Sequence, residues 1–296
     1  MAKDTFFCPK KSLNCRGKLV QLSTPRIMGI LNLTPDSFYD GGKYLSADQA
    51  LKQGEKLLAD GADILDLGAA STRPGAPLLP QTEERERLEP ILKAIVKAFP
   101  EAIISLDTYY AQTAEMAVNE GAHMINDVSA GRIDPGMFET IARLRVPYIL
   151  MHMQGTPQTM QQQPAYTNLL KDIAAFFYTK IAMLEEMGVH DIIIDPGFGF
   201  GKTLEHNYRL LHGLDFLAMF ERPILAGLSR KSIVNKVLGI PAREALNGTS
   251  IVNALALLKG ADILRVHDVK EAVEAVKIIE AYKTANQQDS FSPKQQ

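Results

Sequence analysis

The chain has 296 residues, of which 46% are hydrophobic and 22% charged, as in an ordinary globular protein with a sizeable core. Its formal net charge is −2, so its overall charge does not attract nucleic acid, and any basic site must be local. The N-terminus lacks the apolar segment of a secretory signal, and no run approaches the roughly 18 residues of a membrane span. We therefore expect a cytoplasmic protein without nucleic acid or membrane partners.

Residues 1–25 precede the first strongly apolar run and are predicted to be an N-terminal extension. Its stretch GKLVQLS (residues 17–23) is predicted to form a strand that closes one end of the domain that follows. The extension also contains both cysteines of the chain, Cys8 and Cys15. Neither has the His or Cys companions of a zinc site, so both are expected to be reduced surface thiols.

From residue 26 onward, short runs rich in Ile, Leu and Val alternate with longer amphipathic stretches. The runs cover residues 26–34, 63–68, 102–108, 123–129, 146–153, 191–197, 222–229 and 262–268. Strands that are buried on both faces have this continuous apolar character, and eight of them are the number that closes a parallel barrel. No glycine-rich dinucleotide turn follows the first run, which counts against an open doubly wound sheet.

Helical signals lie between these runs. Residues 46–63 begin with Ser46 as a candidate N-cap and contain Gly61 at the end of the helix. Residues 166–188 contain a helical apolar stripe, made of Leu170, Ile173, Phe177, Ile181 and Leu184. The predicted fold is a single (β/α)8 TIM barrel over residues 26–285, with long loops after its first two strands and a flexible tail at residues 286–296.

The segment DPGFGFGKT (residues 195–203) is superficially similar to a phosphate-binding loop. A P-loop needs a glycine five residues before its Gly-Lys pair, and that position is Pro196, which has no N–H to donate. The dinucleotide fingerprint fails too, because Lys202 stands where its last glycine would be. We interpret the segment as the end of a strand, with Lys202 as a nearby loop cation without a catalytic role.

Polar residues stand at nearly every predicted strand end, where the chemistry of such barrels is located. They are Asn32, Asp107, Asn126, His152, Asp195, Ser229 to Lys231, Arg265 and His267. Two carboxylates and an amide, at Asp107, Asp195 and Asn126, suit a flat heterocycle with adjacent N–H donors. Asn32, Arg265 and His267 come together where the first and last strands meet and suit an anion. The histidines lack metal-ligand spacing, which counts against a transition-metal site.

The loops after the first two strands, NLTPDSFYDGGKY (residues 32–44) and GAASTRPGAPLLPQT (residues 68–82), are long and rich in Pro, Gly, Ser and Thr. They contain Asp36, Phe38, Arg73 and Pro74. Loops of this length on the catalytic face of a barrel are often lids or binding elements, so we expect both to close over the site.

With these motifs in place, the chain resembles the dihydropteroate synthases, the pterin-binding barrel enzymes of folate biosynthesis. The matching segments are MGILNLTPDSF, STRPGA, SLDT, INDVS, LMHMQGTPQTM, DPGFGFGK, LSRKS and RVHDV. The resemblance implies condensation of 6-hydroxymethyl-7,8-dihydropterin pyrophosphate with p-aminobenzoate, giving 7,8-dihydropteroate and pyrophosphate. It also implies inhibition by sulfonamides, which imitate p-aminobenzoate, and a homodimer formed through the late helices, with a contribution from LLHGLDFLAMF (residues 210–220).

The resemblance also assigns roles to residues. The pterin would be bound by Asp107, Asn126, Asp195, Phe200 and Lys231. The pyrophosphate would be bound by Asn32, Arg265 and His267, with a Mg²⁺ ion that contacts Asn32. The p-aminobenzoate would be framed by Phe38, Thr72, Pro74, Lys231 and Ser232. The catalytic set would be Asp36, Arg73, Lys231, Arg265 and His267. The chain departs from the family pattern at Ala70, where a glutamate is common.

We expect the C–O bond to pyrophosphate to break early, because the anion-binding residues stabilise charge on the leaving group. Two alternative functions use a similar barrel: a non-catalytic pterin-binding homologue and a methyltetrahydrofolate methyltransferase. The first would have lost loop or anion residues that are present here. The second would have no use for TPDSF or STRPG.

Overall fold

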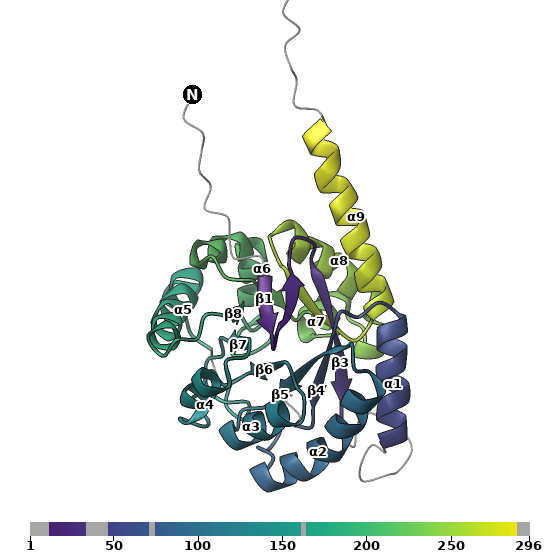
Figure 1. Cartoon of the computed structure of the whole chain (residues 1–296). Coiled ribbons are helices and arrows are strands. Elements are labelled where there is room, and N and C mark those ends of the chain that lie inside the picture. Colours follow the sequence, from purple (N-terminus) through teal and green to yellow (C-terminus); the bar gives the residue numbers. More distant parts are fainter. Residues whose placement is uncertain (1–11, 34–46, 71–74, 161–163, 289–296) are drawn as a thin grey trace, which may run out of the picture.

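The computed structural model describes residues 12–33, 47–70, 75–160 and 164–288, and its centre is a sheet of eight parallel strands (Figure 1). The strands are β3 (Arg26–Asn32), β4 (Ile64–Gly68), β5 (Ile103–Asp107), β6 (Met124–Asp127), β7 (Tyr148–Met151), β8 (Ile192–Asp195), β9 (Leu225–Ala226) and β10 (Ile263–Val266). Each lies inside one of the eight apolar runs, so the strand predictions are confirmed. The runs are longer than the strands because they continue into the loops that follow.

The sheet closes into a barrel. Its hydrogen-bonded order is β8-β7-β6-β5-β4-β3-β10-β9, and a parallel bridge between Ile194 and Ile224 joins the two ends of that order. The amide nitrogen of Ile194 also lies 2.9 Å from the carbonyl oxygen of Pro223. Strands β4 to β8 are buried at every residue, as strands between a filled interior and a ring of helices must be. The predicted α/β barrel is confirmed.

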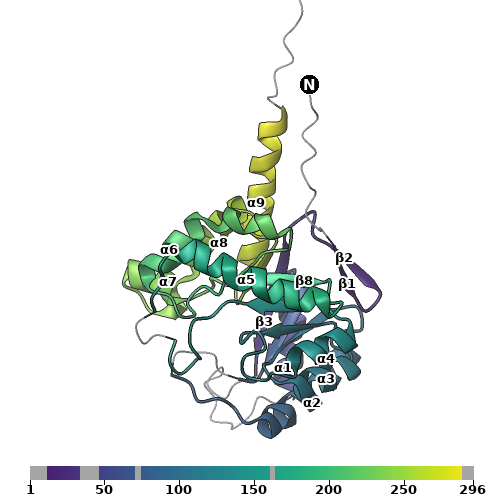
Figure 2. The same ribbon diagram turned by 90° about the vertical axis from the view of Figure 1, so that its left-hand side faces the viewer.

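Helices connect the strands and cover the outside of the barrel (Figures 1 and 2). The α-helices are α1 (Ala47–Ala59), α2 (Gln81–Ala98), α3 (Ala111–Asn119), α4 (Met137–Leu144), α5 (Leu169–Glu186), α6 (Leu204–His212), α7 (Ser232–Leu238), α8 (Leu246–Leu258) and α9 (Val269–Gln288). Two short 3₁₀ helices, η2 (Leu214–Phe220) and η3 (Ala242–Glu244), add to them. Gly61 follows α1 with a φ of +102°, consistent with its predicted place after a helix. Ser46, the candidate cap of α1, lies outside the described residues.

Helix α5 buries the apolar stripe predicted for it, with one difference. Ile173, Phe177, Ile181 and Leu184 are buried against the barrel, whereas Leu170 is only half-buried. Leu169, the first residue of the helix, is buried instead. The stripe therefore begins one residue earlier than its spacing suggested, because a 3.6-residue repeat drifts around the helix at its ends.

An antiparallel hairpin closes the barrel at the end where the strands begin. It consists of β1 (Ser12–Cys15) and β2 (Lys18–Gln21), joined through Arg16 and Gly17, whose φ angles of +55° and +89° suit a tight hairpin turn. Buried side chains of the hairpin region pack against one residue from each of the eight barrel strands; this cluster is Leu13, Cys15, Leu22, Met28, Ile64, Ile103, Met124, Ile149, Ile193, Leu225 and Ile263.

The expectation for Cys15 was wrong. Its side chain is buried in the hairpin cluster, and burial raises the pKa of the thiol to about 12, with a smaller contribution from Asp191. The thiol is therefore an inert packing group, in contrast to an exposed reactive cysteine. Cys8 lies outside the described residues. The reason for the error is positional: strand alternation in β1 points Leu13 and Cys15 together toward the barrel.

Helix α9 projects beyond the barrel on the hairpin side (Figures 1 and 2). Its first half packs on the barrel through Val269, Ala272, Ala275, Val276 and Ile279, while Ile278 and Tyr282 are exposed. Across the ranges that the structure describes, no helix combines the length and the apolar character needed to cross a membrane.

Candidate active site

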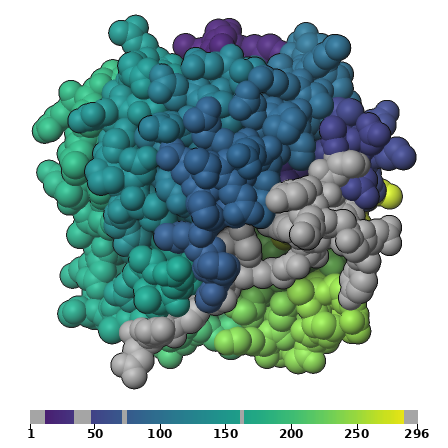
Figure 3. Space-filling model, turned by 90° about the horizontal axis from the view of Figure 1, so that it is seen from below, coloured from purple at the N-terminus to yellow at the C-terminus, as the bar shows by residue number. Residues whose placement is uncertain are grey.

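The carboxyl ends of the strands bring the predicted polar residues to one end of the barrel. Asn32 is level with Gly68 in the parallel register, and Gly68 is level with Asp107. Asp107 is in turn level with Asn126. Four adjacent strand ends therefore place an amide, a glycine, a carboxyl group and a second amide side by side. The missing side chain of Gly68 leaves room for Asp107, whose Cβ and Oδ2 lie 3.3 Å and 3.6 Å from where a Gly68 Cβ would stand. Figure 3 shows this end of the molecule, bordered by blue chain from α2 and light-green chain from the region of α7.

Arg265 is the centre of this polar layer. Its Nε donates to Asp66 Oδ2 at 2.6 Å, and its Nη2 donates to Asp107 Oδ2 at 2.9 Å. Asn126 Nδ2 donates to the same Asp66 oxygen at 3.1 Å. Residues from strands β10, β4, β5 and β6 are thus joined across the barrel interior, so the arginine connects the predicted pterin-binding and anion-binding groups.

Asp66 was absent from the sequence prediction. It lies in the middle of β4 and is completely buried, and its Oδ1 has no hydrogen-bond partner within the described part of the chain. The available signal was a carboxylate inside the apolar run DILDLG, since an acid in a doubly buried strand must be paired. A search restricted to strand ends could not find it.

The charged groups in this layer shift one another's pKa values. Burial raises the pKa of Asp107 to about 7; Arg265 opposes that shift, while Asp66 adds to it. Desolvation disfavours the charge on Arg265, but Asp66 and Asp107 outweigh it and raise its pKa. The guanidinium therefore stays charged, and Asp107 is a carboxyl group whose proton is easily gained or lost near neutrality.

Asp195 and Lys231 form the opposite side of the site. Asp195 Oδ1 accepts from the amide of Gly197 at 2.7 Å, and Lys231 Nζ donates to the carbonyl oxygen of Phe198 at 2.8 Å. The Lys231 ammonium also lies 4.8 Å from the ring centre of Phe200. Burial raises the pKa of Asp195 and lowers that of Lys231 to about 8, and each charge opposes the shift of the other.

His267 is held by Ser229. The two side chains meet at 3.0 Å between Ser229 Oγ and His267 Nδ1, and the backbone N–H of His267 donates to the same Oγ at 3.2 Å. When the hydroxyl donates to Nδ1, the ring proton lies on Nε2, which makes that nitrogen a donor. Desolvation and the charge of Arg265 lower the pKa of His267 to about 4, so the ring is neutral before an anion binds. Arg230, which follows Ser229 in the sequence, forms a bidentate ion pair with Asp268.

The strand end that contains Asp107 is joined to the second long loop. Thr108 Oγ1 donates to Glu84 Oε2 at 2.7 Å, and Glu84 is completely buried on α2. Tyr110 Oη donates to the carbonyl oxygen of Leu79 at 2.9 Å, while the Leu79 amide donates to Tyr109 Oη at 3.2 Å. The arm of the loop that leads into α2 is thereby fixed to β5.

Lys202 lies in the loop after β8, as its interpretation as a loop cation requires, but it is enclosed by protein. Its side chain is 2% exposed, and its Nζ lies 3.0 Å from Nδ1 of His152, which is also buried. Ser232 is exposed at the start of α7, Asn32 is half-buried at the end of β3, and Ala70 is half-buried. The remaining predicted site residues, Asp36, Phe38, Thr72, Arg73 and Pro74, lie outside the described residues.

The sequence and fold were compared with those of known proteins. The model of the pterin binding enzyme family matches residues 28–267. The dihydropteroate synthase of Escherichia coli K12 is 41% identical over 281 residues, which are 94% of this chain and 99% of the relative. The structure of the Yersinia pestis dihydropteroate synthase with a sulfonamide drug has a TM-score of 0.87 at 43% identity, covering 93% of this chain and 99% of that one. The Xanthomonas albilineans enzyme with 4-aminobenzoic acid has a TM-score of 0.86 at 39% identity, covering 92% and 98%.

These similarities extend over nearly the whole length of each partner, and three of the residues that the resemblance singled out, Asp107, Asn126 and Arg265, are joined through hydrogen bonds that include Asp66. The chain belongs to the pterin-binding enzymes and, among them, to the dihydropteroate synthases.

Proposed function

We propose that the polar end of the barrel binds the two halves of the pterin pyrophosphate in adjoining places and lets pyrophosphate leave before the amine attacks. Dihydropteroate synthases join the methylene carbon of 6-hydroxymethyl-7,8-dihydropterin pyrophosphate to the nitrogen of p-aminobenzoate. The arrangement around Arg265 is the observation that supports this proposal. Its guanidinium contacts Asp107, a proposed pterin ligand, and Arg265 lies on β10, the strand that leads to His267.

In this proposal, the pterin ring lies between Asp195 and the pair Asp107 and Asn126. A carboxylate accepts two parallel hydrogen bonds, which matches the adjacent N–H groups of the aminopyrimidinone ring. Asp195 suits this role because its Oδ1 is oriented by Gly197 and its surroundings are dry. Lys231 and the ring of Phe200, stacked on each other, would cover the pterin edge.

The diphosphate would be bound by Asn32, Arg265 and His267. Strands β3 and β10 are hydrogen-bonded neighbours, so Asn32 and His267 follow adjacent strand ends. The guanidinium is a charged donor, and His267 with its proton on Nε2 is a neutral one that can become charged as the leaving group develops negative charge. Such fixed donors act most strongly on charge that appears in the transition state.

Early departure of pyrophosphate leaves a cation delocalised into the pterin ring, with the electron pair of the broken C–O bond on the diphosphate. The amine nitrogen then forms the new C–N bond and loses a proton. An aromatic amine is neutral at pH 7 and has a free lone pair, so no strong general base is required. Excluding water matters more, because water would capture the same cation.

The proposed p-aminobenzoate site combines Lys231 and Ser232 with Phe38, Thr72 and Pro74 from the two long loops, and Asp36 and Arg73 would complete the catalytic geometry. We propose that sulfonamides compete for this place, as suggested by the sulfonamide complex of the Yersinia pestis relative. Inhibition that competes with p-aminobenzoate and not with the pterin pyrophosphate would support it, whereas competition with the pterin substrate would contradict it.

A Mg²⁺ ion fits this site if the substrate phosphates supply most of its ligands. Within the ranges that the structure describes, no three His, Cys, Asp or Glu side chains gather as a metal group, and the best placed carboxylates, Asp66 and Asp107, are paired with Arg265. Mg²⁺ commonly keeps several waters and is bound through substrate phosphates with one or two protein ligands. Asn32 would supply the protein ligand, and the bound ion would neutralise charge on the diphosphate.

The experiment that tests this mechanism uses pterin pyrophosphate labelled with ¹⁸O in the C–O–P bridge, incubated with the enzyme and Mg²⁺ but without p-aminobenzoate. Reversible C–O cleavage moves the label into non-bridging positions of the recovered substrate, and a trapped cation yields 6-hydroxymethyl-dihydropterin and pyrophosphate. Either result supports early departure. A substrate that keeps its label until p-aminobenzoate is added would mean that the amine displaces pyrophosphate directly.

We also propose a homodimer formed through the late helices. Exposed apolar side chains gather on η2 and α8, namely Phe216, Met219, Ile251, Leu255 and Leu258. The two elements adjoin, because Lys259 Nζ lies 3.1 Å from Asp215 Oδ2. Contiguous exposed apolar surface of this kind is characteristic of association sites. Sedimentation equilibrium should give a dimer for the wild type and a monomer for Leu255→Glu; a monomeric wild type would refute the proposal.

The cytoplasmic location of the protein stays a prediction.

A further inference from the structure

The most unusual buried group outside the proposed chemistry is Lys202, in the loop after β8. Its Nζ lies 3.0 Å from His152 Nδ1, and it donates to the carbonyl oxygens of Gly197 at 2.9 Å and Phe200 at 3.0 Å. A longer contact of 3.4 Å reaches the carbonyl oxygen of His152. All of these partners are neutral, so the ammonium is held by dipoles and not by a carboxylate.

Burying a lysine in this way is costly. Burial lowers the pKa of Lys202 to about 7, and the charge of the nearby Asp195 only partly opposes that change. His152 is neutral, because burial and the Lys202 charge lower its pKa to about 2, so Nδ1 can accept a hydrogen bond. An apolar side chain would fill the same space without a desolvation cost. The four directed contacts therefore hold the loop backbone in one position, which apolar packing alone would not do.

These contacts fix the loop that orients two proposed pterin ligands. Gly197 and Phe200 are the two ends of a turn, since the Phe200 amide donates to the Gly197 carbonyl oxygen at 3.1 Å. The same turn supplies the amide that orients Asp195 and the carbonyl of Phe198 that accepts from Lys231. Lys202 thus binds the carbonyl groups at both ends of the turn whose amide and carbonyl contact Asp195 and Lys231.

The turn is also pressed against the loop after β7. A Cβ at Gly197, where φ is +69°, would lie 1.9 Å from the carbonyl oxygen of His152, and one at Gly201 would lie 2.5 Å from that of Gln154. Only glycine allows this approach. The two backbones meet so closely that their facing carbonyl groups need a shared donor, and the Lys202 ammonium supplies it.

We propose that Lys202, with His152 as its partner across the two loops, is a positioning residue for pterin recognition. It acts through the backbone of the Gly197–Phe200 turn and contacts neither substrate. This inference rests on the proposed pterin site. It predicts that loss of the ammonium chiefly disturbs Asp195, which is oriented by the Gly197 amide, and so weakens pterin binding more than p-aminobenzoate binding to the pterin-loaded enzyme.

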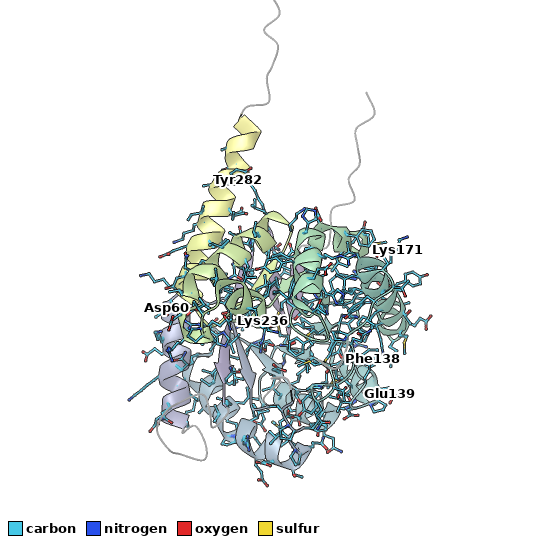
Figure 4. All side chains as sticks on the ribbon, turned by 180° about the vertical axis from the view of Figure 1, so that it is seen from behind. Asp60, Phe138, Glu139, Lys171, Lys236 and Tyr282 are labelled. Atoms are coloured by element: carbon cyan, nitrogen blue, oxygen red, sulfur yellow. The ribbon has the colours of Figure 1, made fainter. Side chains whose placement is uncertain are left out.

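The test compares Lys202→Met with wild type and with Lys171→Met, which removes an exposed lysine on α5 (Figure 4). The measurements are thermal unfolding, the Kd of 6-hydroxymethylpterin by titration calorimetry, and KM for each substrate. For a folded Lys202→Met we expect a pterin Kd about tenfold or more weaker, with KM for p-aminobenzoate at saturating pterin pyrophosphate within about twofold of wild type. A folded Lys202→Met with wild-type pterin affinity would overturn the proposal.

A second pair of variants decides the matter if Lys202→Met does not fold. His152→Leu removes the acceptor on the ring, and His152→Gln restores an acceptor of similar reach. We expect the pterin Kd to weaken about fivefold in His152→Leu and to recover in His152→Gln. Equal affinities in the two variants, or failure of His152→Leu to fold, would show a purely structural role and overturn the proposal. If wild type itself neither binds pterin nor turns over, the proposed function fails instead.

Discussion

Arg265 and Asp66 form an ion pair across 199 positions of sequence, with 2.6 Å between Nε and Oδ2. Asp66 is completely buried on β4, and the same oxygen accepts from Asn126. The pair orients the guanidinium so that Nη2 meets Asp107 Oδ2 at 2.9 Å. Asp66 thus connects the proposed pterin-binding and diphosphate-binding groups without being placed to touch the diphosphate itself.

Replacement of Asp66 should therefore impair catalysis strongly. Asp66→Asn leaves the shape but removes the charge opposite a buried arginine, and losing one partner of such a pair typically costs about 2 kcal/mol or more. We expect kcat/KM for pterin pyrophosphate to fall about 30-fold or more.

A matched control for this variant is Asp63→Asn, which breaks the ion pair with Arg26 where β3 begins, far from the proposed site. It should leave kcat/KM within about twofold of wild type. Steady-state kinetics of the two purified variants checks both expectations. Similar losses in both would mean that the barrel as a whole, and not Arg265, was affected.

Lys231 should give the enzyme an alkaline limit. Burial lowers its pKa to about 8, so the free enzyme loses the ammonium as pH rises through that value. We expect kcat/KM for pterin pyrophosphate, which reports the free enzyme, to lose a further factor above about pH 8, beyond the decline near pH 7 that deprotonation of Lys202 causes. In Lys231→Arg, whose guanidinium keeps its proton, the rate should be lower but this further decline should move to higher pH. A pH–rate profile from pH 6 to 10 measures this, and an unchanged alkaline limb in the variant would assign it to another group.

Glu84 should make the protein less stable as pH rises. Burial raises its pKa to about 7, against the opposing hydrogen bond from Thr108. The folded state therefore holds a proton that the unfolded state releases near pH 4.5, and this contribution to stability is lost as pH rises toward 7. Glu84→Gln keeps a neutral group of the same shape and should raise the free energy of unfolding at pH 8 by about 1 to 3 kcal/mol.

The same comparison at pH 5 should show a smaller gain for Glu84→Gln, because that pH lies only slightly above the unfolded pKa of 4.5, where the linkage effect begins. Denaturant unfolding at the two pH values provides the measurement. Glu86→Gln, on the exposed face of the same helix, serves as the control and should change neither value. A Glu84→Gln protein that gains no stability at pH 8 would show that the fold does not raise the pKa of Glu84.

The N-terminal hairpin should contribute stability without contributing to catalysis. Leu13 is completely buried at the bottom of the barrel, whereas Leu19 on the same hairpin is 62% exposed. Leu13→Ala should cost about 2 to 5 kcal/mol in the free energy of unfolding, while Leu19→Ala should cost less than about 0.5 kcal/mol. Both should keep wild-type kcat/KM at 25 °C. A large loss of activity in folded Leu13→Ala would mean that the two ends of the barrel are coupled.

The sequence by itself determined the eight strands, the closed α/β barrel and the polar residues at the strand ends. It did so because doubly buried strands require continuous apolar runs, and because parallel strands place their carboxyl ends on one face. The resemblance to the dihydropteroate synthases rests on the same local segments. The register that makes Asp107 level with Asn126 follows from that local pattern once the barrel is closed.

Only the tertiary structure decided which of these groups touch. The pairing of Arg265 with Asp66, the burial of the hairpin residue Cys15 against the barrel strands and the contact of Lys202 with His152 each join segments far apart in the chain. Sequence spacing reports the periodicity of one element at a time. Contacts between elements depend on how the barrel closes and on which side chains then share a dry interior, where an unpaired charge is too costly to keep. For this reason Asp66 and Lys202 were visible as residues in the sequence but not as parts of the site.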